Sequence, residues 1–522
     1  MNFKIIITLI VAFIANSVFS ANILYVTPVA SPSHHVWNRV LAFGLIERGH
    51  NVTMLTHDAE KDPLPKNFTI ILLEGIYQKR NASLDIDALL SQTPMSNVPD
   101  MYNWGLYVCK HDITTKGLAT LLNYPADFKF DLIVFDVTLG QCLYPLIERF
   151  RDPPVVAVTP FLLPPVLLRT FGNNLYSSYM PFYNSQFTNI MSFKERLLNF
   201  IYVYYELIYR NYVFLSRATE IAKKRFGENI RSLEETERKM GMLLCNIDIM
   251  LDYPIALPPN IIPIGGLQVK APKELPKDLQ EILDKAEHGA ILFSLGTNLR
   301  ADNLDLNKRK AFLDAFARIP QIVLWKFGSN ITEDLPKNVI IRNWLPQNDI
   351  LGHPNLKLFI SHVGTLSTQE AIYHGIPILG MPIFSDQKVN IAKMEHRMLA
   401  IYVDIKNISF EIMYEKLIEM LNNPIYYNNV KKVSELYRDQ PQAALDRALF
   451  WIEHVLRHGT AEHLVSVARD MPSYKINNLD VLAVLALCLT LLYSFVMLIL
   501  TGLRFILTFR RQNKKQKISK TK

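Results

Sequence analysis

The sequence predicts an α/β protein with two doubly wound domains, followed by one C-terminal transmembrane helix. Strand-like apolar runs alternate with helical periods over most of the 522 residues, which is typical of helices packed around parallel sheets. The alternation restarts after a Pro- and Gly-rich break near 258–276, so two domains are expected. The composition is 49% hydrophobic and 20% charged, with four cysteines. It excludes a mostly disordered chain and a disulfide-stapled scaffold.

Residues 1–20 are predicted to form a secretory signal peptide. Lys4 gives a positively charged start, and Ile5–Ala15 is an apolar run that is too short to span a bilayer. Ser20 is a small residue at a cleavage position before Ala21. The alternative is a buried first strand.

Val481–Leu503 is long enough for a transmembrane helix, because its 23 uncharged residues would cover roughly 34 Å. The tail at 504–522 has eight basic residues and no acidic one, so the positive-inside rule places it in the cytosol and 21–480 on the lumenal side. We expect a type I single-pass protein of the endoplasmic reticulum membrane. A buried core helix is the alternative. Lys520, third from the end, leaves a lysine-based retrieval signal open beside a tail that only fixes orientation.

The net charge of +8 comes from the two ends of the chain. Lys4 and the tail hold nine of the 56 basic residues and none of the 48 acidic residues. The rest of the chain is close to neutral, so the charge reports membrane topology. No nucleic-acid partner is expected.

Three lumenal cysteines match no metal-ligand spacing and leave one disulfide open, with its pairing undetermined: Cys109, Cys142 and Cys245. Glycosylation sequons begin at Asn51, Asn67, Asn81, Asn330 and Asn407. Asn51 leads a predicted strand, so we expect glycan access there to be poor.

The N-terminal domain, 21–265, is expected to begin with a strand–helix–strand unit. Its predicted elements are a strand at Ile23–Thr27, a loop at 28–33, a helix at His34–Arg48, and strands at Asn51–Leu55 and Leu132–Phe135, the last followed by Asp136. Short continuous apolar runs of this kind are typical of the buried strands of a parallel sheet.

The C-terminal domain, 266–465, repeats the pattern, and 466–479 is expected to link it to the transmembrane helix at 480–503. Its predicted elements are strands at Ala290–Ser294, Gln321–Phe327, Val339–Asn343, Lys357–Ile360 and Ile378–Met381, and helices at about 305–318 and Thr368–His374. Gly375 and Pro377 end the second helix.

Residues 171–215 are unusually aromatic, with 14 Phe or Tyr in 45 positions. Charged residues within the segment argue against a second membrane span. Two interpretations remain open. The segment is either ordinary helical core, or a lipophilic binding pocket whose surface dips into the membrane interface.

His34 and Asp136 are candidates for an acid–base pair. His34 lies where the first loop becomes a helix, and there the helix dipole keeps an imidazole neutral and able to accept a proton. Asp136 follows another strand, so its carboxylate can approach the same sheet edge and orient the ring. No G-x-G-x-x-G loop or G-x-S-x-G nucleophile motif is present, which favours a base acting directly on substrate. The alternative is that His34 only caps the helix or packs in the core.

Polar residues also follow successive predicted strands of the second domain. The helix that begins after Ser361-His-Val-Gly-Thr365 offers backbone amides to a phosphate. Further candidates are His362 as a phosphate donor, Glu370 for a ribose, Asp386 and Gln387 for sugar hydroxyls, and Trp344 with Gln347 at a turn where an indole can stack on a base.

Several motifs together resemble the signature of the UDP-glycosyltransferases. The motifs are Trp344-Leu-Pro-Gln-Asn-Asp349, Ile360-Ser-His-Val-Gly364, Glu370-Ala-Ile-Tyr-His-Gly-Ile-Pro377, Phe384-Ser-Asp-Gln387, Phe293-Ser-Leu-Gly-Thr297 and Ile264-Gly-Gly-Leu267. The resemblance covers nearly the whole chain and looks closest to the animal microsomal branch, particularly its insect members. It implies the GT-B fold of two Rossmann-like domains, the first binding the acceptor and the second the UDP-sugar.

The resemblance also implies roles for single residues. His34 stands 16 residues before His50, as the family's catalytic base does, and Asp136 matches the acid that supports that base, which leaves His35 as the weaker candidate. The implied donor site comprises Trp344 and Gln347 at the uracil, Ser294, Thr297 and His362 at the phosphates, Glu370 at the ribose, Asp386 and Gln387 at the sugar, with Gly296, Gly364 and Thr365 as further donor-binding residues. The UDP-sugar is a co-substrate, and neither a cofactor nor a metal is expected.

The sequence departs from the family pattern at two single positions and over 365–369, which lacks the Asn-Gly of many vertebrate members and leaves the donor open. Val363 replaces the first Gly of the usual His-Gly-Gly and adds bulk beside the phosphates. Ile255 stands where some glucuronidating relatives carry Arg, which favours UDP-glucose over UDP-glucuronate. Asp85-Ile-Asp87 has the D-x-D spelling of metal-dependent transferases, but it lies in a helical stretch of the acceptor half and we interpret it as a coincidence.

The sequence therefore predicts inverting transfer of a hexose, glucose favoured and glucuronate open, from a UDP-sugar to a hydroxyl of a small lipophilic alcohol or phenol. Membrane lipid is expected as a further partner, detoxification as the setting, and homo-oligomerisation is left open. A catalytically silent lipophile-binding membrane protein on the same fold is the alternative, suggested only by Val363.

Overall fold

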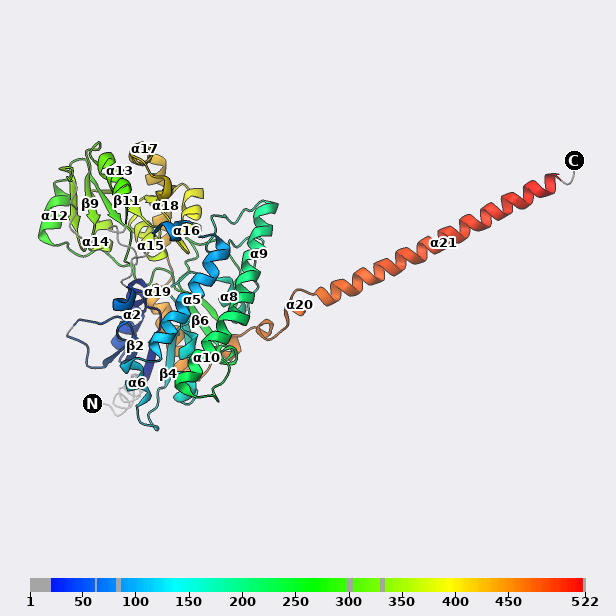
Figure 1. The fold of residues 1–522 in the computed structure, drawn as a ribbon, viewed down its shortest axis with the longest axis horizontal. Helices are drawn as coiled ribbons and strands as arrows, with labels where there is room; N and C mark the ends of the chain where they lie inside the picture. Colours follow the sequence, from blue (N-terminus) through cyan, green and yellow to red (C-terminus); the bar gives the residue numbers. More distant parts are fainter. Residues whose placement is uncertain (1–19, 62, 81–85, 298–303, 329–333, 520–522) are drawn as a thin grey trace, which may run out of the picture. The chain divides into compact units, whose positions relative to one another are not determined.

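The computed structural model describes residues 20–519 apart from 62, 81–85, 298–303 and 329–333. The predicted signal peptide, apart from Ser20, therefore lies outside the described residues, as do Asp85 and the sequons at Asn81 and Asn330. The chain divides into two compact units, Met1–Val465 and Ser466–Lys522 (Figure 1).

A seven-stranded parallel sheet forms the first half of the larger unit, in the order β3-β2-β1-β4-β5-β6-β7. Its strands are β1 Asn22–Thr27, β2 Asn51–Thr56, β3 Phe68–Leu72, β4 Leu132–Asp136, β5 Val155–Thr159, β6 Met242–Cys245 and β7 Ile261–Pro263. The central strands are buried on both faces, which explains their continuous apolar sequences.

A six-stranded parallel sheet forms the second half, in the order β10-β9-β8-β11-β12-β13. Its strands are β8 Ala290–Ser294, β9 Ile322–Lys326, β10 Val339–Arg342, β11 Leu356–Ser361, β12 Ile378–Gly380 and β13 Ala400–Tyr402. In both sheets the strand order reverses beside the first strand, which is where doubly wound proteins bind ligands.

Helices cover both faces of each sheet. Those of the first half are α2 Pro32–Glu47, α3 Ile76–Arg80, α4 Ile86–Leu90, α5 Pro94–Asp112, α6 Lys116–Leu122, α7 Pro145–Arg149, α8 Pro165–Thr170, α9 Phe193–Tyr209, α10 Leu215–Phe226 and α11 Leu233–Arg238, with the short turns η1 Gln141–Leu143 and η2 Arg210–Phe214. Those of the second half are α12 Lys277–Asp284, α13 Leu306–Phe316, α14 Gln347–Leu351, α15 Thr365–His374, α16 Gln387–His396, η4 Ile405–Asn407, α17 Phe410–Asn422, α18 Pro424–Arg438 and α19 Ala444–His458.

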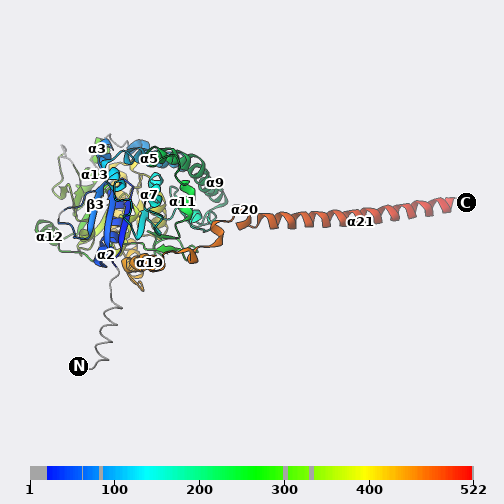
Figure 2. The same ribbon diagram turned by 90° about the horizontal axis from the view of Figure 1, so that it is seen from below.

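The last of these helices returns to the first sheet. Figure 2 shows α5 and α9 on one face of that sheet and α2 with α19 on the other. Leu445 and Leu449 of α19 lie against Gly44 of α2, close enough that an added Cβ at Gly44 would meet the Leu445 side chain at 2.8 Å. The end of the chain's second half is therefore part of the packing of the first sheet.

Every strand and helix named from the sequence for the two α/β domains is present, with ends shifted by at most three residues. The helix expected at Thr368–His374 begins earlier, at Thr365, because Gly364 has extended backbone and starts the turn. Strands β3, β5, β6, β7 and β13 were not predicted.

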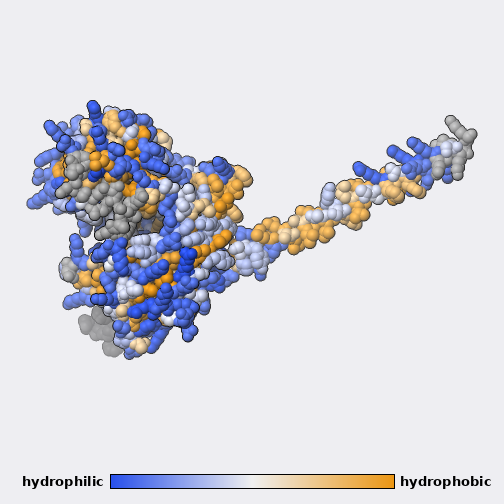
Figure 3. Space-filling model, in the orientation of Figure 1, coloured by the Kyte–Doolittle hydropathy of each residue, from blue (hydrophilic) through white to orange (hydrophobic). Residues whose placement is uncertain are grey.

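The smaller unit is dominated by one helix. It contains the short elements η6 Val467–Arg469 and α20 Ser473–Ile476, and then α21, Leu479–Ser519, a helix of 41 residues. Figure 3 shows apolar residues along its first part and polar residues toward its end. By length and composition α21 can cross a membrane. It extends beyond the expected span, because the basic tail continues the same helix.

The side chains show which cysteines are paired and which glycosylation sequons are exposed. The cysteine pair is Cys109–Cys142, which joins α5 to η1, and Cys245 is a buried free thiol. The expectation of poor access at Asn51 is wrong, because this residue is exposed at the start of β2. Asn67 is instead half-buried, and its amide nitrogen donates to the carbonyls of Ile46 (3.3 Å) and His50 (2.7 Å).

Candidate active site

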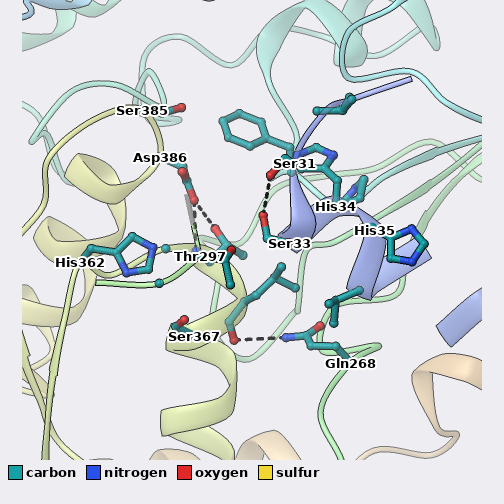
Figure 4. Close-up of a pocket in the computed structure, with 18 of the residues that line it drawn as sticks. Ser31, Ser33, His34, His35, Gln268, Thr297, His362, Ser367, Ser385 and Asp386 are labelled. Atoms are coloured by element: carbon teal, nitrogen blue, oxygen red, sulfur yellow. Dashed lines mark hydrogen bonds between the residues drawn. The ribbon is translucent and has the colours of Figure 1, made fainter. Parts of the chain in front are cut away.

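The carboxyl ends of the two sheets face each other across one cavity of about 1390 Å³. Figure 4 shows its two walls, with His34 and His35 on one side and His362, Asp386 and Thr297 on the other. Parallel strands bring the loops that follow them to a common edge, so residues far apart in sequence meet here.

His34 lies on the first wall, in the first turn of α2. Pro32 fixes the start of this helix, and Ser31 precedes it in extended backbone. The ring Nδ1 of His34 is 3.1 Å from Oδ2 of Asp136, and the ring lines the cavity. The sequence-predicted pair is therefore brought together. With the Nδ1 proton held by the carboxylate, Nε2 is left with a lone pair.

Asp136 is fully buried and, besides His34, is held by three hydrogen bonds from two residues. Asn38 Nδ2 donates to Oδ2 at 2.9 Å, while the amide and hydroxyl of Thr138 donate to Oδ1 at 3.1 and 2.7 Å. Such a carboxylate keeps its orientation and can stabilise an imidazolium formed on His34. Asn38 and Thr138 were missed from the sequence. Asn38 could have been found, because it lies four residues after His34 and so on the same helix face.

His35 also lines the cavity, but both of its ring nitrogens are engaged. Nδ1 is 3.2 Å from the hydroxyl of Thr56 and Nε2 is 2.9 Å from Oε1 of Glu60. Glu60 in turn accepts from Arg39. His35 therefore lacks a nitrogen free to take a proton from a substrate.

His362 lies on the second wall, directly after β11. It is half-buried, and its partial burial, with a contribution from the charge of Lys326, lowers its pKa to about 4. Its Nδ1 has no hydrogen-bond partner among the described residues. A Cβ added at Gly296 would come 2.6 Å from this ring and one at Gly364 2.7 Å, so both glycines are needed for its close packing. His362 is a neutral ring with an unused polar atom, which suits a hydrogen bond to a ligand.

Asp386 caps the neighbouring helix. Its Oδ2 accepts from the amide (3.2 Å) and the hydroxyl (2.7 Å) of Thr365 and from Asn390 Nδ2 (3.1 Å). Burial raises the pKa of this carboxyl. The first amide of α15, which the sequence analysis offered to a phosphate, is therefore occupied by Asp386.

Gln387 begins α16 and is held through its carbonyl. Its Oε1 accepts from the amides of Ile383 (2.7 Å) and Phe384 (3.1 Å), which leaves its amide nitrogen as the group able to donate. Ser385, in the turn between Phe384 and Gln387, has φ of +58°, an uncommon conformation for a residue other than glycine.

Gln347 and Glu370 form a second polar group on this wall. Gln347 Nε2 donates to Glu370 Oε2 at 2.6 Å and to the Ser367 hydroxyl at 3.1 Å. Burial raises the pKa of Glu370 to about 7, although the hydrogen bond from Gln347 opposes the shift. Trp344 nearby is 68% exposed, so a flat ring can stack on its indole.

Lys326 is a lining residue that sequence reasoning missed. It is the last residue of β9, and its Nζ donates to the carbonyl of Gly296 at 3.2 Å and lies 4.6 Å from the centre of the Trp344 ring. Burial lowers its pKa. The sequence signal that could have predicted Lys326 as a lining residue is its position as a basic residue at the end of a strand.

The structure gathers all the sequence-predicted donor residues at this wall. The cavity is lined by Ser294, Gly296, Thr297, Trp344, Gln347, His362, Gly364, Thr365, Glu370, Asp386 and Gln387. Ser294 is a polar residue at the carboxyl end of β8, and its hydroxyl accepts from the Gly296 amide at 3.2 Å.

The aromatic segment does not form the pocket. Within 171–215, all of which the structure describes, no residue lines the cavity. Phe182, Tyr183 and Phe214 are instead core, while the outer face of α9 is exposed. The apolar wall beside His34 comes from other elements, chiefly Met101, Trp104, Leu139 and Phe161. The pocket interpretation of this segment is therefore wrong, and the core interpretation holds for its inner face.

Asp87, the second acid of the D-x-D spelling, pairs with Lys308 Nζ at 2.9 Å. Among the described residues no group of three His, Cys, Asp or Glu side chains is arranged to hold a metal ion.

Solved glycosyltransferases share this architecture of two facing sheets. The calicheamicin glycosyltransferase CalG4 matches with a TM-score of 0.57 at 16% identity, covering 84% of this chain and 99% of that chain. At this identity the likeness shows the GT-B fold alone.

Sequence comparison identifies the family. The model described as "UDP-glucoronosyl and UDP-glucosyl transferase" matches residues 23–517. The UDP-glycosyltransferase UGT5 of Dactylopius coccus is 34% identical over 496 residues, covering 94% of this chain and 93% of the relative. The UDP-glucuronosyltransferase 2B15 of Homo sapiens is 33% identical over 476 residues, covering 87% and 88%. The chain belongs to this family and is a UDP-glycosyltransferase.

Proposed function

We propose that the protein transfers a hexose, with inversion, from a UDP-sugar to a hydroxyl of a small lipophilic alcohol or phenol. The observation that carries this proposal is the pair of His34 and Asp136 facing the polar wall around His362 across one cavity. Glucose is the favoured hexose and glucuronate the second candidate, because Ile255 offers no positive charge to a uronate carboxylate.

In the proposed mechanism, His34 is the general base. Its Nε2 takes the proton of the acceptor hydroxyl while the oxygen attacks the anomeric carbon from the face opposite UDP. The bond to the diphosphate breaks, and UDP leaves with the electron pair. Asp136 holds the imidazolium that forms.

The second wall would hold the donor and stabilise the leaving group. Neutral His362, the Lys326 cation and the loop amides around Gly296 and Gly364 would meet the negative charge of the diphosphate. The remaining proposed contacts are Trp344 and Gln347 with the uracil, Ser294 and Thr297 with the phosphates, Glu370 with the ribose, and Asp386 and Gln387 with the sugar, while Thr365 holds Asp386 in place. The mechanism assigns no role to a metal ion.

The apolar wall supports a lipophilic acceptor. Met101, Trp104, Leu139 and Phe161 line the same cavity as His34 and carry no charge, so a flat alcohol or phenol can displace water there. A role in detoxification is consistent with such an acceptor.

We propose further that the protein is a type I glycoprotein of the endoplasmic reticulum, with 1–20 as signal peptide, 21–265 and 266–465 as lumenal domains, 466–479 as linker, 480–503 as span and 504–522 as cytosolic tail. Asn51 and Asn407 are exposed and suit glycans. Large exposed apolar side chains on α9 support contact with membrane lipid: Phe193, Leu197, Phe200, Ile201 and Ile208.

Replacing the base tests the proposal. His34→Ala is expected to lower kcat with UDP-glucose and a generic phenol by at least about a hundredfold, because general-base catalysis contributes that much. UDP release is the measurement, and UDP-glucuronate run in parallel decides the donor.

His35→Ala is the matched control, with an expected loss of less than about fivefold, because both of its nitrogens are already engaged. Equal turnover by wild type and His34→Ala would overturn the assignment. Failure of UDP to raise the melting temperature of the wild type would favour a silent lipophile-binding protein.

A further inference from the structure

His57 is a buried histidine next to the loop 28–33 that leads into His34. It directly follows β2 and does not line the cavity, so the proposed reaction makes no use of it. Its side chain is closed off from solvent.

Both ring nitrogens of His57 face backbone carbonyl oxygens. Nδ1 is 3.0 Å from the oxygen of Leu73, and Nε2 is 3.2 Å from the oxygen of Pro28. A carbonyl oxygen only accepts hydrogen bonds, and a neutral imidazole has a single N–H. The neutral ring would therefore turn a lone pair toward one carbonyl. Only the imidazolium donates to both.

A buried carboxylate supplies the matching charge. Asp112, at the end of α5, is fully buried, and its Oδ2 lies 3.5 Å from Nε2 of His57. Neither oxygen of Asp112 has a hydrogen-bond partner among the described residues. Burial alone would lower the pKa of His57, but Asp112 and the two carbonyls raise it overall. Burial raises the pKa of Asp112, so its ionised form depends on the imidazolium beside it.

The adjacent His111 shows the opposite arrangement. Its Nδ1 is 3.1 Å from Lys79 Nζ, which donates, and its Nε2 is 2.8 Å from the carbonyl of Glu74, which accepts. A neutral His111 satisfies both contacts. His57, which faces two acceptors, is therefore satisfied as the imidazolium, whereas His111, which faces one donor and one acceptor, is satisfied as the neutral ring.

Pro28 links this ion pair to the active site. It is the first residue after β1, and it packs so closely on Gly140 that a Cβ added there would lie 2.4 Å from the proline ring. The Pro28 carbonyl accepts from His57 on another side. Both contacts fix the start of the loop whose end sets the position of His34.

We propose that His57 is a positioning residue: the buried His57 imidazolium, paired with Asp112, holds the Pro28 carbonyl and thereby the loop that places His34 against Asp136. Loss of the His57 proton removes one of its two hydrogen bonds, releases the loop and lowers kcat. The inference rests on the proposed function only for its kinetic readout.

Other charged groups around the pair do not replace this proton. His111 of α5 acts on Asp112, and it is itself bonded to Lys79 of α3 and to the carbonyl of Glu74 after β3, while Asp58 is the residue that follows His57. Asp58 accepts from the hydroxyl of Tyr77, and Glu74 accepts from the amides of Lys116 and Gly117, so both carboxylates are engaged elsewhere.

The kinetic test compares pH profiles of full-length protein in membranes, with UDP-glucose and an alcohol acceptor that does not ionise. In the wild type, kcat is expected to fall at alkaline pH as His57 loses its proton. Asp112→Asn should move this fall to lower pH by at least one unit, because the carboxylate that holds the proton is gone. His57→Gln should lower kcat about tenfold near neutral pH with the KM for the donor within about twofold, and it should abolish the alkaline fall. An Asp112→Asn profile that superimposes on the wild type overturns the proposal.

A stability measurement separates this inference from the proposed activity. A raised His57 pKa means that the ion pair stabilises the fold below about pH 6.5 and that this contribution is lost as the pH rises through the folded-state pKa. The melting temperature of the wild type should therefore exceed that of His57→Gln most at pH 6, and the gap should narrow toward pH 9. His374→Gln is the control: burial lowers the pKa of His374 to about 4, so this ring is already neutral at pH 6 and its variant should show no such narrowing. If the difference in melting temperature between the wild type and His57→Gln is the same at every pH, His57 is not charged in the folded protein. This outcome contradicts the proposal whether or not turnover is detected.

Discussion

Val363 is the residue whose backbone fits its side chain least well. It sits between His362 and Gly364 with φ of +61° and is fully buried. A Cβ in the left-handed region costs about 1–2 kcal/mol, and a branched Cβ is the least tolerated there. The Val363 side chain offsets this by packing in the core around β11, where it lies beside Gly380 and Ile391. The departure from the usual glycine is therefore accommodated by the fold.

The opposition between backbone strain and side-chain packing at Val363 predicts an unusual order of stability for its glycine and alanine variants. Val363→Ala removes the packing but keeps the Cβ strain, whereas Val363→Gly removes both. We expect Val363→Gly to melt at or above the temperature of Val363→Ala, the reverse of the ordinary preference for alanine over glycine. Thermal unfolding of the two variants measures it. An alanine variant that is clearly the more stable would show that the loop does not hold Val363 in this conformation.

Glu370 predicts a pH dependence of stability. Its pKa is raised from the ordinary 4.5 to about 7 by burial, so the folded state binds a proton more tightly than the unfolded state between these values. Stability then falls as pH rises through this window, by on the order of 2–3 kcal/mol in total. Glu370→Gln removes this loss. Urea unfolding at pH 5 and pH 8 should show the variant gaining on the wild type at the higher pH.

At the residue scale, the sequence predicted which side chains converge but not how each is bonded. His34, Asp136 and the donor residues follow strands or begin helices, so their meeting at one edge was predictable. The engagement of Thr365 by Asp386 and the placement of Lys326 depend on side-chain packing between loops, which no local pattern encodes.

Among the elements, α4 crosses from the first half of the chain to the second. Ile86 is buried in the core of the second sheet, and Leu89 and Gln92 line the cavity. The carbonyl of Gln92 accepts from Lys388 at 2.7 Å. This segment therefore ties the first half of the chain to the second beside the cavity.

Loosening α4 should impair catalysis without removing a catalytic group. Ile86→Ala removes buried contacts worth about 2–5 kcal/mol in a core, so α4 should detach and leave the cleft open. We expect kcat/KM for the acceptor to fall about three- to tenfold. The control is Asp87→Asn, which should stay within about twofold, because Asp87 is 69% exposed and its pair with Lys308 is screened by water. Equal effects of the two variants would contradict the bridging role.

Short length explains only two of the five missed strands, because β3 and β5 have five residues each, as many as the predicted β4. β7 and β13 have three residues each, too few for a period to be recognised. The aromatic segment failed differently. Phe214 of the segment packs against Tyr102 of α5, and Tyr102 and Tyr183 both donate to the buried Glu206. Composition alone does not tell such a core from a pocket.

At the scale of the whole molecule, the cavity belongs entirely to the larger unit. Both sheets, α19 and every lining residue precede Ser466. A chain that ends at Val465 is therefore expected to fold and to be stabilised by UDP as the full chain is, measured by thermal shift. The exposed face of α9 should still bring this shortened chain down with phospholipid vesicles, and Phe193→Glu with Phe200→Glu should release it. If the chain that ends at Val465 no longer binds vesicles, α9 does not contact the membrane and α21 alone does.

The pairing of Cys109 with Cys142 ties the active site to the chemistry of the compartment in which the chain is made. Cys109 belongs to α5, which carries Met101 and Trp104 of the apolar wall, and Cys142 follows Asp136 by six residues. A covalent link between the helix of the apolar wall and the segment that follows Asp136 forms only where thiols are oxidised. Protein produced in a reducing cytosol would lack that link, so an oxidising host or export to a secretory compartment is the appropriate source for the experiments above.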